Sequence, residues 1–191
     1  MAAPSLIALY SPVMQSGKSE VANTLIRERG FHLVKFADGL KAVAGMVLSS
    51  LGLSSEGIHY YLEGEGKAEV IPQLGITGRV LMQRTGSDYG RDLLHPQVWV
   101  RGVYARLKHH AAQGHDVVID DLRFPNELSM VLQAGGTPLK VFRPAAVKYN
   151  SHQSEGLLDN HPMPTLVNSG TLEQLREAAL QLPEFLRGVS P

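Results

Sequence analysis

Residues 6–25, LIALYSPVMQSGKSEVANTL, decide the fold. The stretch begins with an apolar run that predicts a buried strand over 5–10, and it ends with a helical pattern that predicts a helix over 18–29. Between the two stand Gly17, Lys18 and Ser19. Backbone N–H groups at the start of a helix, together with the helix dipole, attract phosphate. The stretch therefore predicts a phosphate-binding loop between a strand and a helix.

This arrangement is typical of a P-loop, whose pattern is G-x-x-x-x-G-K-[ST]. The second half of the pattern is present, but Pro12 stands where the pattern has its first glycine. Because proline has a fixed φ and no N–H group, the first half of the loop must be built differently. We expect the loop to use the N–H groups of residues 14–19. Taken alone, the stretch leaves open a strand followed by an ordinary capped helix.

The composition bounds the function. The chain has 191 residues, enough for one substantial α/β domain, and its 18 acidic and 18 basic residues give a net charge of zero. We therefore expect no nucleic-acid polymer and no membrane as partner, and any phosphate binding must come from local placement of charge. The absence of cysteine excludes disulfides, thiolate metal sites and cysteine nucleophiles. With no apolar run near the ~20 residues of a membrane span, we expect a soluble intracellular protein.

Further strands are predicted at 31–36, 116–120, 138–142 and 165–168, with helices between them. Asp38 stands where it would cap a helix containing 41–51, and Gly86 and Gly90 predict that a helix over 79–92 is interrupted. Further helices are predicted at 96–113, 124–134 and 172–187, and Thr171 with Gln174 predicts a capping box at the start of the last one. The alternation predicts a three-layer α/β/α fold with a parallel sheet, whose ligands bind at the carboxyl ends of the strands.

Two segments lack clear periodicity. Residues 52–78 contain six glycines with mixed charge, and they predict a mobile surface segment with a short helix near 55–63. Residues 143–164 predict a long polar loop. Both segments could close over substrates and exclude water.

Several polar residues follow the predicted strands. The run VVIDD ends in Asp120 and Asp121, and a carboxylate at such a strand end can hold Mg²⁺, although Asp121 could instead cap the next helix. The stretch DLRFPNE, 121–127, places four hydrogen-bonding side chains beside the proposed phosphate pocket. Basic side chains suit phosphate through bidentate hydrogen bonds, and the further candidates are Lys41, Arg79, Arg84, Arg91 and Arg143.

The eight histidines do not predict a zinc site. His109, His110 and His115 gather near the end of the helix predicted at 96–113, but no H-x-x-x-H or H-E-x-x-H spacing occurs. A Ser/His/Asp site is equally poorly supported, because the chain has no G-x-S-x-G motif.

Taken together and in order, six motifs resemble the phage-type deoxynucleoside monophosphate kinases over most of the chain except 52–78. They are FADGLK (36–41), RVLMQRTGSDYGR (79–91) with Trp99 downstream, VVIDDLRFPNE (117–127), FRP (142–144), HQSE (152–155) and VNSGTLEQL (167–175). The resemblance implies a P-loop kinase fold with a five-stranded parallel sheet in the order 2-3-1-4-5. It also implies transfer of the γ-phosphoryl group of ATP, with Mg²⁺, to a deoxynucleoside monophosphate.

The resemblance implies a site as well. It places Asp38, Arg79, Thr85, Trp99, Asp121 and Glu127 around the acceptor nucleotide, with Arg79 on its phosphate and Trp99 against its sugar or base. Four further residues also match family positions: Gln83, Arg91, Arg123 and Asn126. The expected catalytic residues are Lys18, Arg79 and Arg123, and the expected Mg²⁺ ligands are Ser19 and Asp120. The expected ATP contacts are Met14, Gln15, Ser16, Gly17, Lys18, Ser19 and Arg143, and the expected acceptor contacts are Asp38, Lys41, Arg79, Gln83, Thr85, Arg91, Trp99, Asp121, Asn126 and Glu127.

The expected protein is therefore one P-loop nucleotide kinase domain over 1–191, with 52–78 on the acceptor side and 143–164 as a lid-like loop. It would work in the cytoplasm, or in the host cytoplasm if encoded by a phage, and a homodimer through 96–113 is the oligomer considered. Two alternatives remain open: another small-molecule P-loop kinase, such as a dephospho-coenzyme A kinase, and a nucleotide-binding module without catalysis. The sequence does not determine which bases are accepted.

Overall fold

The computed structural model describes residues 4–13, 15–144 and 156–188. The chain forms two compact units, which are described one at a time. The first unit comprises Met1–Lys35 with Val103–Pro191, and the second comprises Phe36–Gly102. Met14 and residues 145–155 of the loop expected at 143–164, which include the HQSE motif, lie outside the described residues.

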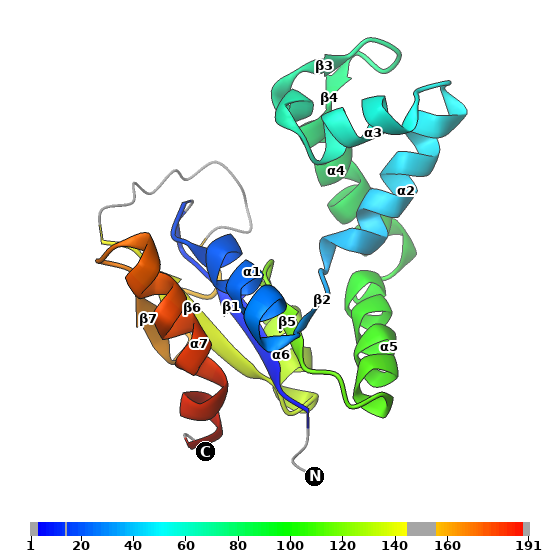
Figure 1. Cartoon of the computed structure of the whole chain (residues 1–191). Helices are drawn as coiled ribbons and strands as arrows, with labels where there is room; N and C mark the ends of the chain where they lie inside the picture. The colour runs from blue at the N-terminus through cyan, green and yellow to red at the C-terminus, as the bar shows by residue number, and fades with distance from the viewer. Residues whose placement is uncertain (1–3, 14, 145–155, 189–191) are drawn as a thin grey trace. The chain divides into compact units, whose positions relative to one another are not determined.

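A five-stranded parallel sheet forms the centre of the first unit (Figure 1). Its order is β2-β5-β1-β6-β7, which is 2-3-1-4-5 when only these five strands are counted, as the resemblance implied. The Cα register pairs Leu6 with Val117 and Leu9 with Leu139. The strands are β1 (Leu6–Tyr10), β2 (His32–Leu33), β5 (Val117–Ile119), β6 (Thr137–Phe142) and β7 (Thr165–Val167).

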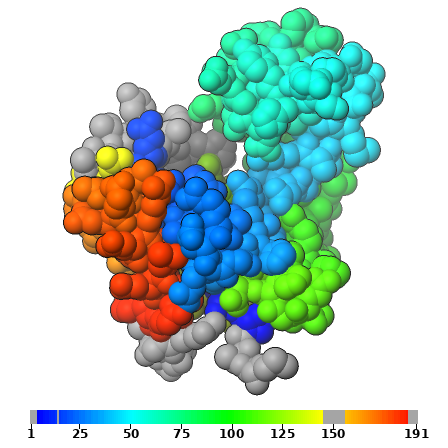
Figure 2. Space-filling model, viewed as in Figure 1, coloured from blue at the N-terminus to red at the C-terminus, as the bar shows by residue number. Residues whose placement is uncertain are grey.

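Helices cover both faces of this sheet, so the expected three-layer α/β/α class is confirmed. Ile7 and Leu9 point to one face, where they share a core with α1 (Lys18–Arg29) and α7 (Leu172–Gly188). On the other face, α6 (Pro125–Gln133) packs against β6. In Figure 2, α1 (blue) and α7 (orange to red) lie side by side on the surface, in agreement with their packing.

The second unit is mainly helical around a small core of Ala44, Leu48, Leu62, Ile71 and Leu81. It contains one antiparallel two-stranded sheet. Its elements are α2 (Ala37–Ser50), α3 (Ser55–Leu62), the 3₁₀ helix η1 (Glu65–Ala68), β3 (Val70–Ile71), β4 (Ile76–Thr77), α4 (Gly78–Arg84), the π-helix η2 (Thr85–Leu94) and the start of α5 (Val98–Ala112).

Three local predictions are corrected by the second unit. Residues 52–78 contain α3 where a short helix was expected, but also the hairpin β3–β4, which their weak periodicity did not reveal. The N-cap of α2 is Phe36, and Asp38 lies in the first helical turn instead. The helix predicted over 79–92 ends early as an α-helix, because α4 stops at Arg84, but the backbone stays helical through Gly86 and Gly90 as the π-helix η2.

Other boundaries agree with the sequence. The helices predicted at 18–29 and 172–187 are α1 and α7, and α5 ends just before Gly114 as expected. Within the parts of the chain that the structure describes, no helix is long and apolar enough to cross a membrane.

Candidate active site

The loop between β1 and α1 forms a hollow at the carboxyl end of β1. Gly17 is the N-cap of α1 with φ 101°, and the Val21 N–H group donates to the Gly17 carbonyl at 3.0 Å. Gln15 is also left-handed, with φ 55°. A cavity of about 270 Å³ is lined by Val13 and residues 15–20. Lys18 and Ser19 thus open a helix that points its positive dipole end into a hollow of phosphate dimensions.

Contacts from distant strands hold this loop in place. The Asn168 Nδ2 group, just after β7, donates to the Ser16 carbonyl at 2.9 Å. Arg143, just after β6, directs Nη1 to the Gln15 carbonyl at 3.5 Å. The Val13 carbonyl accepts from the Ser11 hydroxyl at 2.9 Å. These contacts use the carbonyl groups of Val13, Gln15 and Ser16 and hold the loop around the hollow.

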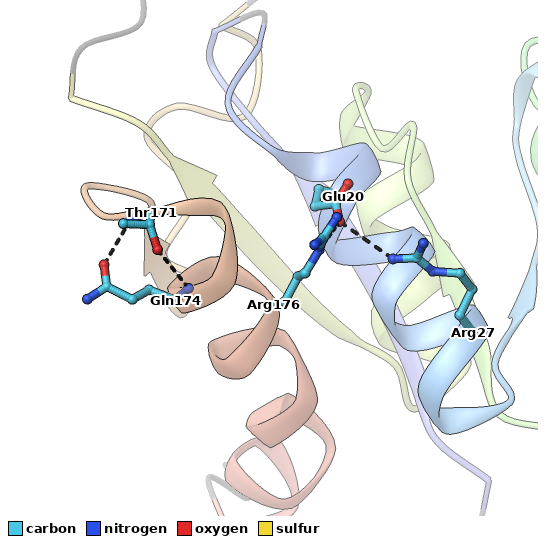
Figure 3. Close-up of polar contacts among 5 residues, drawn as sticks. All are labelled: Glu20, Arg27, Thr171, Gln174 and Arg176. Atoms are coloured by element: carbon cyan, nitrogen blue, oxygen red, sulfur yellow. Dashed lines mark hydrogen bonds and ion pairs between the residues drawn. The ribbon is translucent and has the colours of Figure 1, made fainter.

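Helix α7 is fixed to the same helix that carries Lys18 and Ser19. Glu20, in the first turn of α1, accepts from Arg176 Nε at 2.6 Å and lies 3.6 Å from Arg27 Nη2 (Figure 3). The predicted capping box at the start of α7 is confirmed, because Thr171 and Gln174 exchange two hydrogen bonds. The start of α7 is therefore ordered next to the loop.

Asp120 has the environment expected of a metal ligand. It directly follows β5, the neighbour of β1 in the sheet, and its side chain is 10% exposed. Its Oδ2 atom pairs with Lys35 Nζ at 3.1 Å, whereas its Oδ1 atom is buried without a hydrogen-bond partner among the described residues. A buried carboxylate oxygen is costly to leave unpaired, and Mg²⁺ prefers such ligands. The residues therefore fit the expected ion, with Asp120 and Ser19 as the groups that would hold it.

The loop at 121–127 is organised by Glu127. This carboxylate is 2% exposed, and its Oε2 atom accepts from the N–H groups of Arg123 at 2.9 Å and Phe124 at 3.1 Å. Its own N–H group donates to Asn126 Oδ1 at 3.0 Å. Helix α6 begins here with Pro125 at its first position. Glu127 thus shapes the loop that carries Asp121, Arg123 and Asn126, which is a structural duty beside its predicted contact with the acceptor.

In the second unit, two predicted acceptor contacts lie on one cavity. Asp38 and Lys41, both on α2, line a hollow of about 450 Å³ together with residues of α3. Lys41 Nζ pairs with Glu63 Oε1 at 2.7 Å. An ammonium group held in this way by a carboxylate is a positioned point charge.

The remaining predicted acceptor residues lie on α4, η2 and α5. Arg79 is exposed in the first turn of α4, and Gln83 is half-buried one turn later. Thr85 is 7% exposed at the start of η2. Arg91 Nη1 approaches the Gly86 carbonyl at 3.4 Å.

Trp99 is enclosed by α2 and η2. Its Nε1 group donates to the same Gly86 carbonyl at 2.8 Å, and the residue is 8% exposed. A Cβ atom at Gly90 would lie 2.4 Å from Trp99 Cζ2, and one at Gly39 would lie 3.0 Å from Cε3. The two glycines therefore leave room for the indole ring. The structure thus brings Trp99 and Arg91 together on one carbonyl group.

The predicted residues therefore fall into two groups. The first unit carries the donor loop, Arg143 and residues 120–127, and the second unit carries positions 38, 41, 79, 83, 85, 91 and 99. No role was predicted for three supporting residues. Asn168 holds the loop, Lys35 pairs with Asp120, and Glu63 pairs with Lys41. Each lies at least 22 residues from its partner along the chain, and the only available signal was the position of Asn168 at the end of a predicted strand.

Known proteins are similar to this chain in sequence and in fold. No family model matches the chain. It is 30% identical over 175 residues to a protein of Acanthamoeba polyphaga mimivirus named "Putative deoxynucleotide monophosphate kinase", covering 83% of this chain and 86% of that protein.

Two solved structures that are similar to the chain are described as kinases in their titles. The dephospho-CoA kinase from Campylobacter jejuni matches with a TM-score of 0.50 at 11% identity, covering 97% of this chain and 98% of that one. The APS kinase CysC of Mycobacterium tuberculosis matches with a TM-score of 0.45 at 14% identity, covering 96% and 99%.

The sheet order and the loop around Lys18 define a P-loop kinase, an ATP-dependent phosphotransferase. Within that class, the chain belongs to the deoxynucleotide monophosphate kinase family. The resemblance seen in the sequence is thereby confirmed.

Proposed function

We propose that the protein transfers the γ-phosphoryl group of ATP to a deoxynucleoside 5′-monophosphate and releases ADP and a deoxynucleoside diphosphate. The family membership and the phosphate-sized hollow at Lys18 support this proposal. The hollow is the observation that carries it, because its lining combines a helix N-terminus with a lysine and a hydroxyl group.

In this proposal, the donor phosphates bind to the loop of residues 14–19. Lys18 places its ammonium group on the β- and γ-phosphates, and Arg143 stands next to the loop as a second cation. Ser19 and Asp120 would hold Mg²⁺, which neutralises charge on the phosphates when bound. The remaining task of the loop is to fix the direction of the phosphoryl group with its N–H groups.

The acceptor needs alignment rather than a base. A monophosphate is already ionised at its attacking oxygen, so the site must bring two anions in line and neutralise their repulsion. We assign this work to Arg79, Arg91 and Arg123, with Lys41 as a further cation. Asp38, Gln83, Thr85, Trp99, Asp121, Asn126 and Glu127 are the proposed residues that orient the rest of the acceptor.

The first test is an assay of ADP formation with ATP, Mg²⁺ and each of the four deoxynucleoside monophosphates, with dephospho-coenzyme A run in parallel. We expect turnover with at least one of the four nucleotides and none with dephospho-coenzyme A. Tight nucleotide binding without turnover would identify a binding module instead, and turnover with dephospho-coenzyme A alone would replace the proposed acceptor.

The second test separates the two halves of the site. We expect Lys18→Ala to lower kcat/KM about 10²–10³-fold, the range seen when one preorganised donor to a transition state is removed. Lys108→Ala is the matched control, because the Lys108 ammonium group lies over the Tyr104 ring on the exposed side of α5. Arg79→Ala should lower kcat/KM by a similar factor, with Arg101→Ala, at an exposed arginine of α5, as its control. Activity of either test variant equal to that of its control would refute the corresponding assignment.

A further inference from the structure

Three histidines meet at the amino-terminal edge of the main sheet. His32 opens β2, His110 lies in the last turn of α5, and His115 lies in the turn that leads to β5. One ring nitrogen from each lies within 4.8 Å of the others. The rings of His32 and His115 stack with centroids 4.1 Å apart, and those of His32 and His110 are 4.9 Å apart.

The end of α5 fixes two of these rings relative to each other. The His115 N–H group donates to the His110 carbonyl at 3.0 Å, and the Gly114 N–H group donates to the Ala111 carbonyl at 3.1 Å. Gly114 has φ 73°, so the pair of bonds is the Schellman motif that ends helices at a left-handed glycine. His110 and His115 are therefore held on one side of a rigid turn.

Strand pairing supplies the third ring. The His32 N–H group donates to the Asp116 carbonyl at 2.8 Å, and His32 pairs with Val117 in the parallel register of β2 and β5. The residue before Asp116 is His115, so the pairing that builds the sheet edge also places the His32 ring against the His115 ring. The cluster is thus fixed by backbone hydrogen bonds on both sides.

The spacing of the rings suits a metal ion. In a tetrahedral site with metal–nitrogen bonds of about 2.0–2.1 Å, two ligand nitrogens lie about 3.3 Å apart. The Nδ1 atoms of His110 and His115 are 3.4 Å apart. We propose that His32, His110 and His115 form a binding site for one divalent transition-metal ion, with Zn²⁺ as the ion to test.

The chemistry of the cluster favours this class of ion. Imidazole nitrogen binds Zn²⁺, Cu²⁺ and Ni²⁺, whereas Mg²⁺ selects oxygen ligands. His32 is exposed, so a water molecule can reach the fourth position of the ion.

The location separates this site from phosphoryl transfer. The cluster lies where β2 and β5 begin, whereas the loop around Lys18 lies where β1 ends, and parallel strands place these ends at opposite edges of the sheet. β2 is an edge strand of only two residues. An ion shared by β2 and the end of α5 closes a long loop of chain, and we assign it a stabilising role.

The three histidines of this cluster do not have H-x-x-x-H spacing in the sequence. Two of its members are five residues apart around a helix-ending glycine, and the third comes from a distant strand. The proximity of His110 and His115 in the sequence was visible, but the contribution of His32 depends on the sheet order.

The test is calorimetric titration of the full chain, freed of metal with a chelator, with ZnCl₂ alone. We expect saturable binding of one ion per chain and a Tm that rises with Zn²⁺ concentration. His32→Ala and His115→Ala should each weaken binding at least about tenfold, because even loss of an outer-shell partner costs 10–100-fold. His109→Ala is the matched control, since His109 is an exposed imidazole on the same turn of α5.

The outcomes decide the proposal. Zn²⁺ binding that is lost in the two ligand variants and kept in His109→Ala supports it, provided that the far-UV circular dichroism of each variant matches the wild type. His32→Gln keeps a polar side chain at the exposed strand start and gives a second variant should His32→Ala misfold. Absence of saturable binding by the wild type, or equal binding by wild type and folded His32 variants, overturns the site. ADP formation in Mg²⁺ buffer should be unchanged in His32→Ala.

Discussion

Asn168 donates from Nδ2 to the Ser16 carbonyl at 2.9 Å, and this bond ties the end of β7 to the phosphate-binding loop. The strand end itself is fixed, because the Asn168 N–H group donates to the Phe142 carbonyl at 2.7 Å. The loop has Pro12 in place of the first consensus glycine. It is therefore held by a residue that follows β7, which lies two strands away from β1 in the sheet. Asn168 thus holds the half of the loop that follows Pro12.

Replacing Asn168 with alanine should loosen the loop. The lost hydrogen bond to the nearly buried Ser16 is worth about 0.5–1.5 kcal/mol, so we expect a two- to tenfold rise in the KM for ATP. Stability against urea should fall by a similar free energy. Asn160→Ala is the control, because Asn160 is an exposed asparagine in the preceding segment. Steady-state kinetics with an unchanged KM for ATP would show that the hydrogen bond to Ser16 does not matter.

Gly17→Ala should be more damaging than an ordinary change at a left-handed glycine. A Cβ atom at Gly17 would lie 2.8 Å from both Asn168 Nδ2 and Leu175 Cδ2, in addition to the strain of φ 101°. Gly30→Ala is the matched control, because Gly30 has φ 70° but no neighbouring atom within 4 Å of the added group. We expect the control to lose about 1–2 kcal/mol of stability in urea unfolding, and Gly17→Ala to lose more. Equal losses of stability in the two variants would mean that the loop accommodates the added methyl group at Gly17 without a further cost in free energy.

Glu127 can be tested for its structural duty. Its Oε2 atom accepts two backbone N–H groups while the side chain is 2% exposed. Glu127→Ala leaves both donors without their acceptor, and we expect a loss of about 2–3 kcal/mol in urea unfolding. Glu127→Gln retains an amide oxygen and should lose less. Ser129→Ala, which removes one exposed hydroxyl from the same helix, should change stability little. A neutral Glu127→Ala result would contradict this role.

The packing of Trp99 predicts opposite effects at two glycines. A Cβ atom at Gly90 would lie 2.4 Å from the indole ring, which is itself enclosed, so Gly90→Ala should destabilise by about 1–3 kcal/mol. Gly102, in α5, has nothing within 4 Å of an added Cβ atom, and Gly102→Ala should stabilise by up to about 1 kcal/mol through helix propensity. Thermal unfolding of the two variants should shift Tm in opposite directions. A shift of Tm in the same direction would show that the indole ring can move aside.

Much of the fold could be predicted because the relevant signals are local. Apolar runs and helical spacing predicted the five strands of the main sheet and the helices on its faces, since burial of one face imposes a short period on the sequence. The capping box at Thr171 was readable for the same reason. At Gly86 and Gly90 the low helix propensity of glycine predicted a break, whereas the chain changes from α4 to the π-helix η2, in which Gly90 leaves room for the Trp99 ring.

The candidate site shows the same division between features that depend on local sequence and features that depend on tertiary contacts. The sequence by itself determined the phosphate-binding loop, with Lys18 and Ser19 at the start of a helix and Asp120 at the end of a strand, because each of these depends on neighbours in the chain. The tertiary structure alone decided which groups support them: Asn168 on Ser16, Lys35 on Asp120, and His32 beside His110 and His115. Such contacts join residues far apart in the sequence, and only the order of strands in the sheet determines which of them meet.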